Sequence, residues 1–235
     1  MGALPDFSRR ELHTPERMDD PDCDLGALHR TYEQFDRVNA LVAGWPLVYR
    51  SHLRPRLRRD RATTLLDIGC GGGDVARHLI RWAARDGFTL RVLGIDADER
   101  AIAYAGAQPP MSGLHFRRVM SRTLVEEGQR FDLIISNHML HHLSAAELTE
   151  LLRDCEMLGR HTVHSDIERS ALAWAGFGAM MTPFFRRSFI VSDGMLSVRR
   201  SYRAAELRRA VLPGWRVERP FPFRLLLTHS EADHA

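Results

Sequence analysis

Leu65-Leu66-Asp67-Ile68-Gly69-Cys70-Gly71-Gly72-Gly73-Asp74 is the stretch of this 235-residue chain that decides its fold. An apolar run enters it, four of the five residues 69–73 are glycine, and a segment with helical spacing of apolar residues follows. This order predicts a buried strand, a tight turn and the start of a helix. Glycines let the backbone approach a ligand closely, and the first N–H groups of a helix are free to bind it.

A second apolar run, Arg91-Val92-Leu93-Gly94-Ile95-Asp96, follows about one strand-helix unit later and ends in a carboxylate. An acid at this place can accept hydrogen bonds from both hydroxyls of a ribose. Dinucleotide-binding proteins share the layout with the pattern G-x-G-x-x-G. That pattern is matched here only in its looser form, which runs from Gly71 to Ala76.

The spacing Asp67-x-Gly69-x-Gly71-x-Gly73, the acid at the end of the second run and the later run Asp132-Leu133-Ile134-Ile135-Ser136-Asn137 resemble the class I S-adenosylmethionine (SAM) methyltransferases. The resemblance implies SAM as cofactor and S-adenosylhomocysteine as product. It places the first acid near the methionine amino group, the glycines under the cofactor and Asp96 on the ribose. The residues it assigns to the cofactor are Asp67, Gly69, Cys70, Gly71, Gly73, Asp96, Ala97, Met120, Ser121 and Asn137.

The adenine end departs from this family pattern. The acid and small residue that usually follow the third strand are replaced by Met120-Ser121. Met120 can still pack on an adenine ring, and Ser121 can still form a hydrogen bond with it. The usual carboxylate contact is not expected here.

Strands and helices alternate through the middle of the chain. Strands are expected at 64–69, 90–95, 114–119, 131–136 and 160–166, and helices at 74–86, 98–107 and 144–158, the last with a capping box of Ser144 and Glu147. Such alternation predicts an α/β fold with a mostly parallel sheet and helices on both faces. The resemblance adds a doubly wound, seven-stranded, Rossmann-like sheet, completed by an antiparallel pair at 215–218 and 223–228.

The chain divides into five expected parts. Residues 1–20 are expected to form a poorly ordered polar arm, residues 21–60 the N-terminal lid helices and residues 61–168 the SAM-binding core. Residues 169–202 are expected to form a substrate cap inserted after the fifth strand, and residues 203–235 a C-terminal helix and strand pair. Residues 32–39 resemble the helical lead-in of ubiquinone and menaquinone methyltransferase relatives. Such helices commonly lie over the SAM site, so Tyr32 and Phe35 are substrate candidates. Alternatively, these rings seal the edge of the sheet.

The expected cap is apolar. Residues Ala171–Met181 predict a helix, Asp193-Gly194 predicts a turn, and residues 188–203 are expected to be extended. In an extended segment Arg199 and Arg200 point to opposite faces, so one of them could meet an anionic group in the pocket. Trp174 is a further substrate candidate. The alternatives are a dimer surface or plain core for the cap, and two solvated arginines.

Histidines gather after the fourth strand, in His138-Met139-Leu140-His141-His142-Leu143. Methyl transfer to an oxygen is helped by a general base, and histidine suits this role at neutral pH. The pattern resembles small-molecule methyltransferases, some of which direct the second histidine at the transferred methyl group. His142 is therefore the first catalytic candidate and His141 the second, although both could be structural.

No catalytic metal is expected. The metal-dependent catechol branch of the family has an acid after strand four and an Asp-Asn pair after strand five. This chain has Asn137 and then Ser165-Asp166-Ile167 at those places, so the ligand set is incomplete. The chain also lacks the Asn/Asp-Pro-Pro-Tyr/Phe run of enzymes that methylate exocyclic amines.

Composition excludes several other classes of protein. The net charge is +3 and all 33 basic residues are arginine, but acids alternate with them, so no nucleic-acid surface is expected. Three separated cysteines give neither a disulfide framework nor a zinc spacing. With no apolar run of roughly 18 residues and no signal-type start, we expect a cytoplasmic protein without a membrane span.

The sequence therefore predicts a SAM-dependent methyltransferase that acts on a small, partly apolar molecule, aromatic or polyketide-like, as in secondary metabolism. Transfer to oxygen, with a histidine base, is favoured over transfer to a carbon of a quinone-like ring. The alternatives from other classes are a protein that binds SAM without turnover and an RNA methyltransferase. A homodimer is possible.

Overall fold

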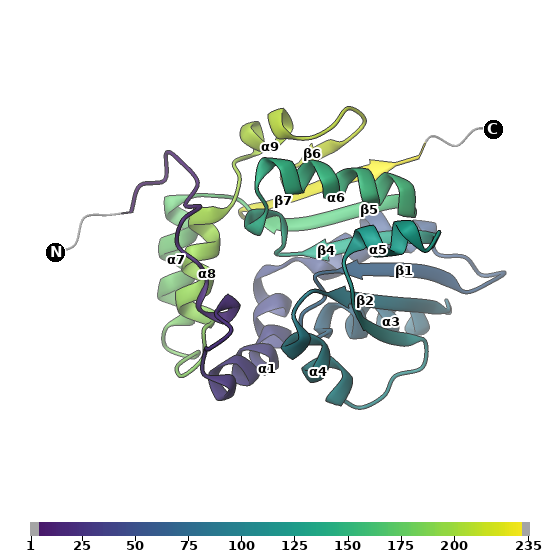
Figure 1. The fold of residues 1–235 in the computed structure, drawn as a ribbon, viewed down its shortest axis with the longest axis horizontal. Coiled ribbons are helices and arrows are strands. Elements are labelled where there is room, and N and C mark those ends of the chain that lie inside the picture. Colours follow the sequence, from purple (N-terminus) through teal and green to yellow (C-terminus); the bar gives the residue numbers. More distant parts are fainter. Residues whose placement is uncertain (1–4, 232–235) are drawn as a thin grey trace.

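The computed structural model describes residues 5–231. Seven strands form one sheet in the order β3-β2-β1-β4-β5-β7-β6 (Figure 1). Their bounds are β1 Thr63–Ile68, β2 Leu90–Asp96, β3 Leu114–Arg118, β4 Phe131–Asn137, β5 Gly159–Ile167, β6 Arg216–Glu218 and β7 Arg224–Ser230. The first five pair in parallel, and β7 runs antiparallel to both β5 and β6. The predicted doubly wound sheet is confirmed.

Nine α-helices accompany the sheet in the described part of the chain. They are α1 Leu25–Val42, α2 Trp45–Val48, α3 Asp74–Arg85, α4 Glu99–Ala107, α5 Ser121–Glu126, α6 Ala145–Leu158, α7 Ala171–Met181, α8 Ile190–Arg200 and α9 Ala204–Ala210. Short helical turns occur at Arg17–Asp19, Tyr49–Leu53, Arg54–Arg56 and Leu140–His142. Local chemistry sets several starts, since the side chain of Asp24 caps α1 and Ser144 forms the predicted capping box with Glu147 at α6.

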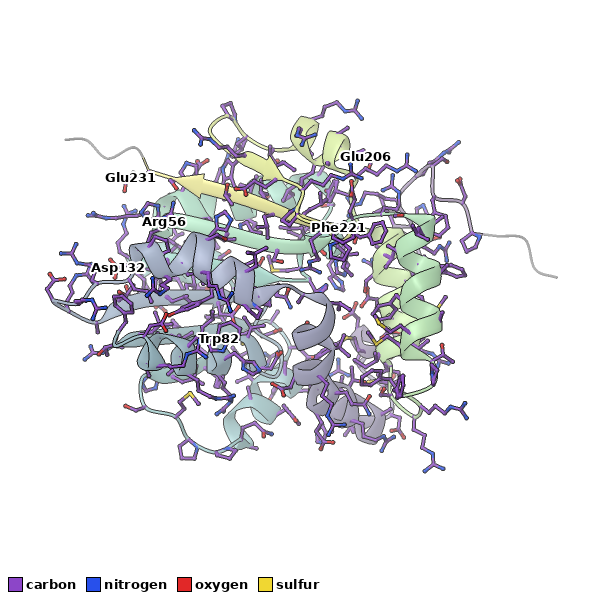
Figure 2. The ribbon with its side chains drawn as sticks, turned by 180° about the vertical axis from the view of Figure 1, so that it is seen from behind. Arg56, Trp82, Asp132, Glu206, Phe221 and Glu231 are labelled. Carbon is purple, nitrogen blue, oxygen red and sulfur yellow. The ribbon has the colours of Figure 1, made fainter. Side chains whose placement is uncertain are left out.

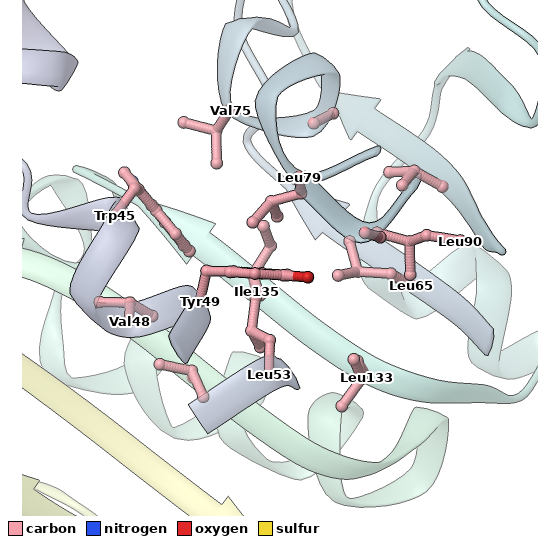
Figure 3. Close-up of a cluster of buried hydrophobic side chains, with 14 of the residues drawn as sticks. Trp45, Val48, Tyr49, Leu53, Leu65, Val75, Leu79, Leu90, Leu133 and Ile135 are labelled. Atoms are coloured by element: carbon pink, nitrogen blue, oxygen red, sulfur yellow. The ribbon is translucent and has the colours of Figure 1, made fainter. Parts of the chain in front are cut away.

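The two faces of the sheet bury separate apolar clusters because neighbouring side chains on a strand point to opposite faces. Leu65 of β1 packs with α3 and with Trp45 and Tyr49 on one face (Figure 3). Leu66 packs with α5, α6 and α9 on the other. Complete burial of Leu65 and Leu66 leaves β1 covered on both sides. The glycine turn that follows β1 is therefore held by the core of the molecule.

Helices α1, α7 and α8 lie together beyond one end of the sheet, at the carboxyl ends of the parallel strands (Figure 1). Tyr32 and Phe35 of α1 and Phe189 just before α8 belong to one apolar cluster. Phe221, labelled in Figure 2, lies in the β6–β7 connection, near the α7–α8 pair. These elements form a wall opposite the strand ends.

The cap differs from the sequence prediction in one respect. Residues expected to be extended form α8, and the expected turn at Asp193-Gly194 lies inside this helix. Gly194 serves close packing, because a Cβ there would collide with the ring of Phe177 on α7. Asp193 accepts a hydrogen bond from the backbone N–H of Met18 at 2.9 Å. Both turn-forming residues are thus used for helix contacts.

The N-terminal segment also differs from the expected loose arm. Residues 1–4 of the arm lie outside the described residues, and residues 5–20, which we name the arm segment, pack on the molecule. Arg10 donates hydrogen bonds to the carbonyl oxygens of His141 and Arg200, at 2.9 and 2.7 Å. Its guanidinium lies 3.7 Å from the centre of the Tyr202 ring. The arm segment thereby joins α8 to the histidine segment after β4.

Candidate active site

The glycine turn after β1 is open to the cavity at one glycine and closely packed at another. Gly69, Gly71 and Gly73 all have positive φ, where L-residues other than glycine are strained. A Cβ on Gly71 would meet no atom within 4 Å, whereas one on Gly73 would collide with the Phe116 ring. Gly71 thus leaves room for a ligand. Gly73 serves packing, and unlike the prediction it does not line the cavity.

Asp96, at the end of β2, holds this turn in place. One carboxylate oxygen accepts a hydrogen bond from the Gly71 N–H at 2.9 Å, and the other accepts one from the Asp98 N–H at 3.0 Å. The carboxylate is half-buried and also lines the cavity. An acid fixed by two backbone donors is ready to accept further hydrogen bonds from hydroxyl groups.

Three acids make this end of the cavity a site for positive charge. Burial raises the pKa of Asp67 well above its usual range, and the charges of Asp74 and Asp96 raise it further. Burial also raises the pKa values of Asp74 and Asp96. The Oδ2 atom of Asp67 is buried and forms no hydrogen bond within the described structure. A cationic ligand would relieve both the repulsion and the unpaired oxygen.

Helix α1 supports the same end through Asn39. Its side-chain N–H donates to Asp74 at 2.8 Å, and its oxygen accepts from Asn137 at 3.3 Å. Tyr32 is buried, with its ring centre 5.0 Å from that of Tyr104. The predicted lid helix thus reaches both the glycine turn and the end of β4.

One cavity of about 1300 Å³ connects the glycine turn with the apolar wall. Thirteen of the predicted site residues line it: Tyr32, Phe35, Asp67, Gly69, Cys70, Gly71, Asp96, Ala97, Met120, Ser121, Asn137, His141 and His142. Met120 is exposed, so its side chain is available to pack on a flat group such as an adenine ring. Ser121 donates its hydroxyl proton to Asp154 at 2.7 Å, so only its lone pairs remain for an adenine.

Three predicted substrate residues lie elsewhere. Trp174 is turned away from the cavity and meets Phe7 of the arm segment edge-on, 6.0 Å between ring centres. Arg199 pairs with Glu11 at 2.9 Å, and Arg200 donates to the carbonyl oxygen of Thr14 at 2.9 Å. Because α8 is a helix, neither arginine points into the main cavity. Both hold the arm segment instead.

His141 forms a buried charged cluster with two acids. Its Nδ1 lies 2.8 Å from Asp166, and its Nε2 lies 3.4 Å from Glu16 of the arm segment. Burial alone would lower the pKa of His141, but the two acids outweigh burial and raise it to about 9. Burial alone would likewise raise the pKa of Glu16, but its pairing with His141 outweighs burial and lowers that pKa to about 2. His141 is therefore protonated at neutral pH.

His142 lies beside this cluster, 4.3 Å between the two ring centres. Its side chain is 30% exposed, with Nε2 at 3.8 Å from Glu16 and Nδ1 at 3.5 Å from Asp19. His142 is therefore the more accessible of the two rings that line the cavity. Burial and the neighbouring Arg224 lower the pKa of His138 to about 3, so this third histidine is neutral.

Glu16, His141 and His142 each offer an atom within 4.8 Å of the others, a set of donors that could hold a metal ion. Glu16 already pairs with the protonated His141. The proton on the ligating nitrogen of His141 would also have to leave, because a metal-bound imidazole nitrogen carries none. The absence of a catalytic metal stays a prediction.

Glu16 and Arg224 are not among the site residues predicted from the sequence, and Asp166 is named there only for its position after the fifth strand. Asp166 stands at the end of β5, where a site residue is expected, so its place was a usable signal. Arg224 interrupts an apolar run before Leu225, and such a lone charge is a second signal. Glu16 gives none, because it lies in a polar segment and is buried only by distant contacts such as the hydrogen bond from Ser197, 2.8 Å.

Comparison with known proteins agrees with this geometry. A family described as "Methyltransferase domain" matches residues 65–161. The ubiquinone biosynthesis O-methyltransferase of Sinorhizobium medicae is 30% identical over 171 residues, which cover 60% of this chain and 66% of that protein. The enzyme of the same description from Roseobacter denitrificans is 35% identical over 83 residues, 34% of this chain and 31% of that one.

Solved structures share the fold at low sequence identity. The plantazolicin methyltransferase BpumL, in complex with a pentazolic desmethylPZN analog and SAH, has a TM-score of 0.58 and 13% identity over 91% of this chain and 92% of its own. Human N-acetylserotonin methyltransferase in complex with SAM has a TM-score of 0.58 and 10% identity over 88% of this chain and 56% of its own.

The fold, the glycine turn and these matches identify a class I SAM-dependent methyltransferase domain in this chain, as its sequence predicts. The chain spans from about a third to just under two thirds of the length of the curated relatives it matches. No helix within residues 5–231 is long and apolar enough to cross a membrane.

Proposed function

We propose that this protein transfers a methyl group from SAM to an oxygen atom of a small, partly apolar molecule. The observation that supports this most is the cavity that joins the acidic glycine-turn end to an apolar wall and has His142 among its lining residues. The sequence relatives, described as ubiquinone biosynthesis O-methyltransferases, favour oxygen as the acceptor.

The residues at the glycine turn fit SAM. The open space at Gly71 suits close passage of a ligand, and Asp96 faces the place of a ribose. SAM carries a sulfonium and an ammonium group, and the buried carboxyls of Asp67 and Asp74 offer matching negative charge. Met120 offers an exposed apolar surface for the adenine.

SAM supplies an activated methyl group on its sulfonium, so the protein needs little covalent chemistry. Its own task is to hold the acceptor oxygen in line and to exclude water. The apolar wall does both, with Phe35 from α1, Phe177 from α7 and Ile190 from α8 facing the cavity. The arm segment contributes Met18 to the same lining.

A proton must leave the acceptor hydroxyl, and His142 is the side chain we assign to receive it. With Nδ1 directed at Asp19, Nε2 is the nitrogen that we assign to accept the proton. The carboxylate of Glu16, 3.8 Å from Nε2, would stabilise the imidazolium that forms. His141 cannot share this role at neutral pH, since it is already protonated. Its fixed positive charge holds Glu16 and Asp166 in place.

The test is an assay with ¹³C-methyl-labelled SAM and a panel of phenols and catechols, followed by SAH release and by carbon NMR of the product. We expect a methoxy signal. His142→Ala should lower turnover by roughly 10²-fold and leave SAM affinity unchanged, as loss of a general base would. His115→Ala, on the exposed face of β3, is the matched control and should turn over normally.

Other outcomes separate the alternatives. A C-methyl signal would replace O-methylation by ring methylation, and SAM binding without label transfer would favour a binding protein. Normal turnover of His142→Ala with a loss in His141→Ala would move the base to the other ring. Loss of turnover in a chelator, with recovery on added metal, would overturn the metal-free mechanism.

A further inference from the structure

Arg224 is a buried charge at the wall of the cavity. It is the first residue of β7, opposite Ile167 of β5, and its side chain lines the cavity although only 5% of the residue is exposed. Arginine is almost never buried this far unless it is paired. Burial lowers its pKa to about 10, which leaves it charged at neutral pH.

The partners of Arg224 in the protein are neutral. Its Nη2 donates to Ser165 Oγ at 2.6 Å and to Asn137 Oδ1 at 3.4 Å, and its Nη1 lies 3.4 Å from His138 Nε2. Its buried Nε has no hydrogen-bond partner in the described structure. Asp166 attracts Arg224 without contact and is itself bonded to His141.

The buried Arg169 is paired with an acid, as buried arginines usually are, and Arg224 is not. Arg169 is completely covered, and Glu206 pairs directly with its guanidinium. Within residues 5–231, no carboxylate lies at ion-pair distance from Arg224. The donors of Arg224 are therefore held in the cavity by neutral groups, with capacity left for an anion.

This guanidinium lies beside the cofactor end of the cavity, because Asn137, which it contacts, also bonds Asn39 there. Asn137 is the last residue of β4 and His138 follows it, and β4 is the neighbour of β1, whose end carries the glycine turn. The planar fork of an arginine matches a carboxylate with two parallel hydrogen bonds. A substrate bound here would present its acid to Arg224 and another of its atoms to the cofactor end.

We propose that Arg224 binds a carboxylate of the substrate, so that the acceptor is an aromatic acid rather than a neutral phenol. This inference rests on the proposed methyltransferase function and narrows its substrate class. The anion recognition expected of Arg199 or Arg200 thus belongs to a different arginine, on β7.

The experiment measures binding of salicylate, protocatechuate and caffeate, each beside its neutral primary amide, by calorimetry with the protein saturated with SAH. We expect the wild type to bind at least one acid roughly 10-fold or more tightly than its amide, because a charge-assisted pair is lost in the amide. Arg224→Met should remove this preference, and Arg224→Lys should keep part of it. Arg216→Met, an exposed arginine on β6, should keep all of it.

SAH affinity in each variant separates the possible failures. Equal affinity for SAH in the wild type and Arg224→Met, with loss of the acid preference, supports the proposal. A large loss of SAH affinity in Arg224→Met would mean that the arginine holds the carboxylate of the cofactor, and it would overturn the proposal. Acids bound no better than amides, or not bound at all, would also overturn it, and the methyltransferase function would stand. A wild type that fails to bind SAH would contradict that function itself.

Discussion

Asp67 is a residue whose effect on the stability of the protein is expected to oppose its role in cofactor binding. Its carboxyl is buried beside two further acids, and its pKa is raised well above the usual value. A raised acid pKa contributes stability in full below the unfolded value of about 3.9, and this contribution is lost as pH rises from there through the folded pKa. At neutral pH the buried Asp67 carboxyl therefore destabilises the ligand-free protein.

Asp67→Asn is accordingly expected to raise the unfolding free energy of the ligand-free protein at pH 7 by about 1 kcal/mol, or about 2–4 °C in Tm. The same change should weaken SAM binding, because the asparagine offers no charge to the ammonium group. Calorimetric unfolding and SAM titration measure the two effects. Asp132→Asn is the control, since the pairing of Asp132 with Arg61 lowers its pKa to about 2 and its loss should destabilise. A less stable Asp67→Asn would contradict the proposed repulsion.

At the scale of elements, periodicity predicted the five parallel strands closely, and the structure extends or shortens them by a residue or so. Residues 190–200 show where such prediction fails. Asp193-Gly194 is a turn signal by composition, but here the aspartate bonds the backbone of Met18 and the glycine admits the Phe177 ring. Both are contacts with residues distant in sequence. Local spacing contains no information on them, and tertiary packing decides the helix.

The arm segment is an element whose closure should depend on pH. Its Glu16 has a folded pKa of about 2, so its contribution is present above the unfolded value of about 4.3 and lost as pH falls toward 2. His141 has a folded pKa of about 9, so its contribution is full below about 6.5 and lost as pH rises toward 9. Closure is therefore expected to be strongest between about pH 4.5 and 6.5.

We expect trypsin to cleave after Arg17 faster as pH rises from 7 to 9, by up to about 10-fold per unit if closure requires protonated His141. Mass spectrometry of timed digests measures the rate. A free peptide of residues 9–22 corrects for the pH dependence of trypsin itself. His141→Gln should be cleaved quickly at every pH. A corrected rate that does not change with pH in the wild type would show that the ion pair does not hold the arm segment.

At the scale of the whole molecule, the sequence predicted one end of the cavity better than the other. The cofactor end is built from residues at or just after the ends of their strands, such as Asp96 and Gly71, so motif and strand position are enough to place them. The acceptor end is assembled from α8, the arm segment and β7. Glu16 reaches it through a contact with His141, more than a hundred residues away, and Arg224 through a contact with Ser165, 59 residues away, and no local pattern records either contact.

Because ligand binding stabilises the whole folded chain, Tm reports on the cofactor end without a known substrate. SAH at about 100 times its Kd should stabilise the wild type by about 2.7 kcal/mol, or roughly 5–10 °C in Tm. Asp96→Ala removes hydrogen bonds to the ribose hydroxyls that we assign to this carboxylate, together on the order of 2–3 kcal/mol. At the same SAH concentration, the variant should keep less than about 1 kcal/mol of the stabilisation.

Asp96 also accepts the Gly71 N–H, so the variant could lose SAH through a displaced glycine turn. Asp96→Asn separates the two causes, because its side-chain oxygen can still accept that N–H while its charge is gone. An Asn variant with a reduced shift supports the ribose contact, since the turn is kept. A full Tm shift in Asp96→Asn together with a reduced Tm shift in Asp96→Ala would assign the loss of SAH binding to a displaced glycine turn. Arg224→Met should retain the wild-type shift, because the acid that it binds belongs to the acceptor end. A full shift in Asp96→Ala would leave the ribose role without support.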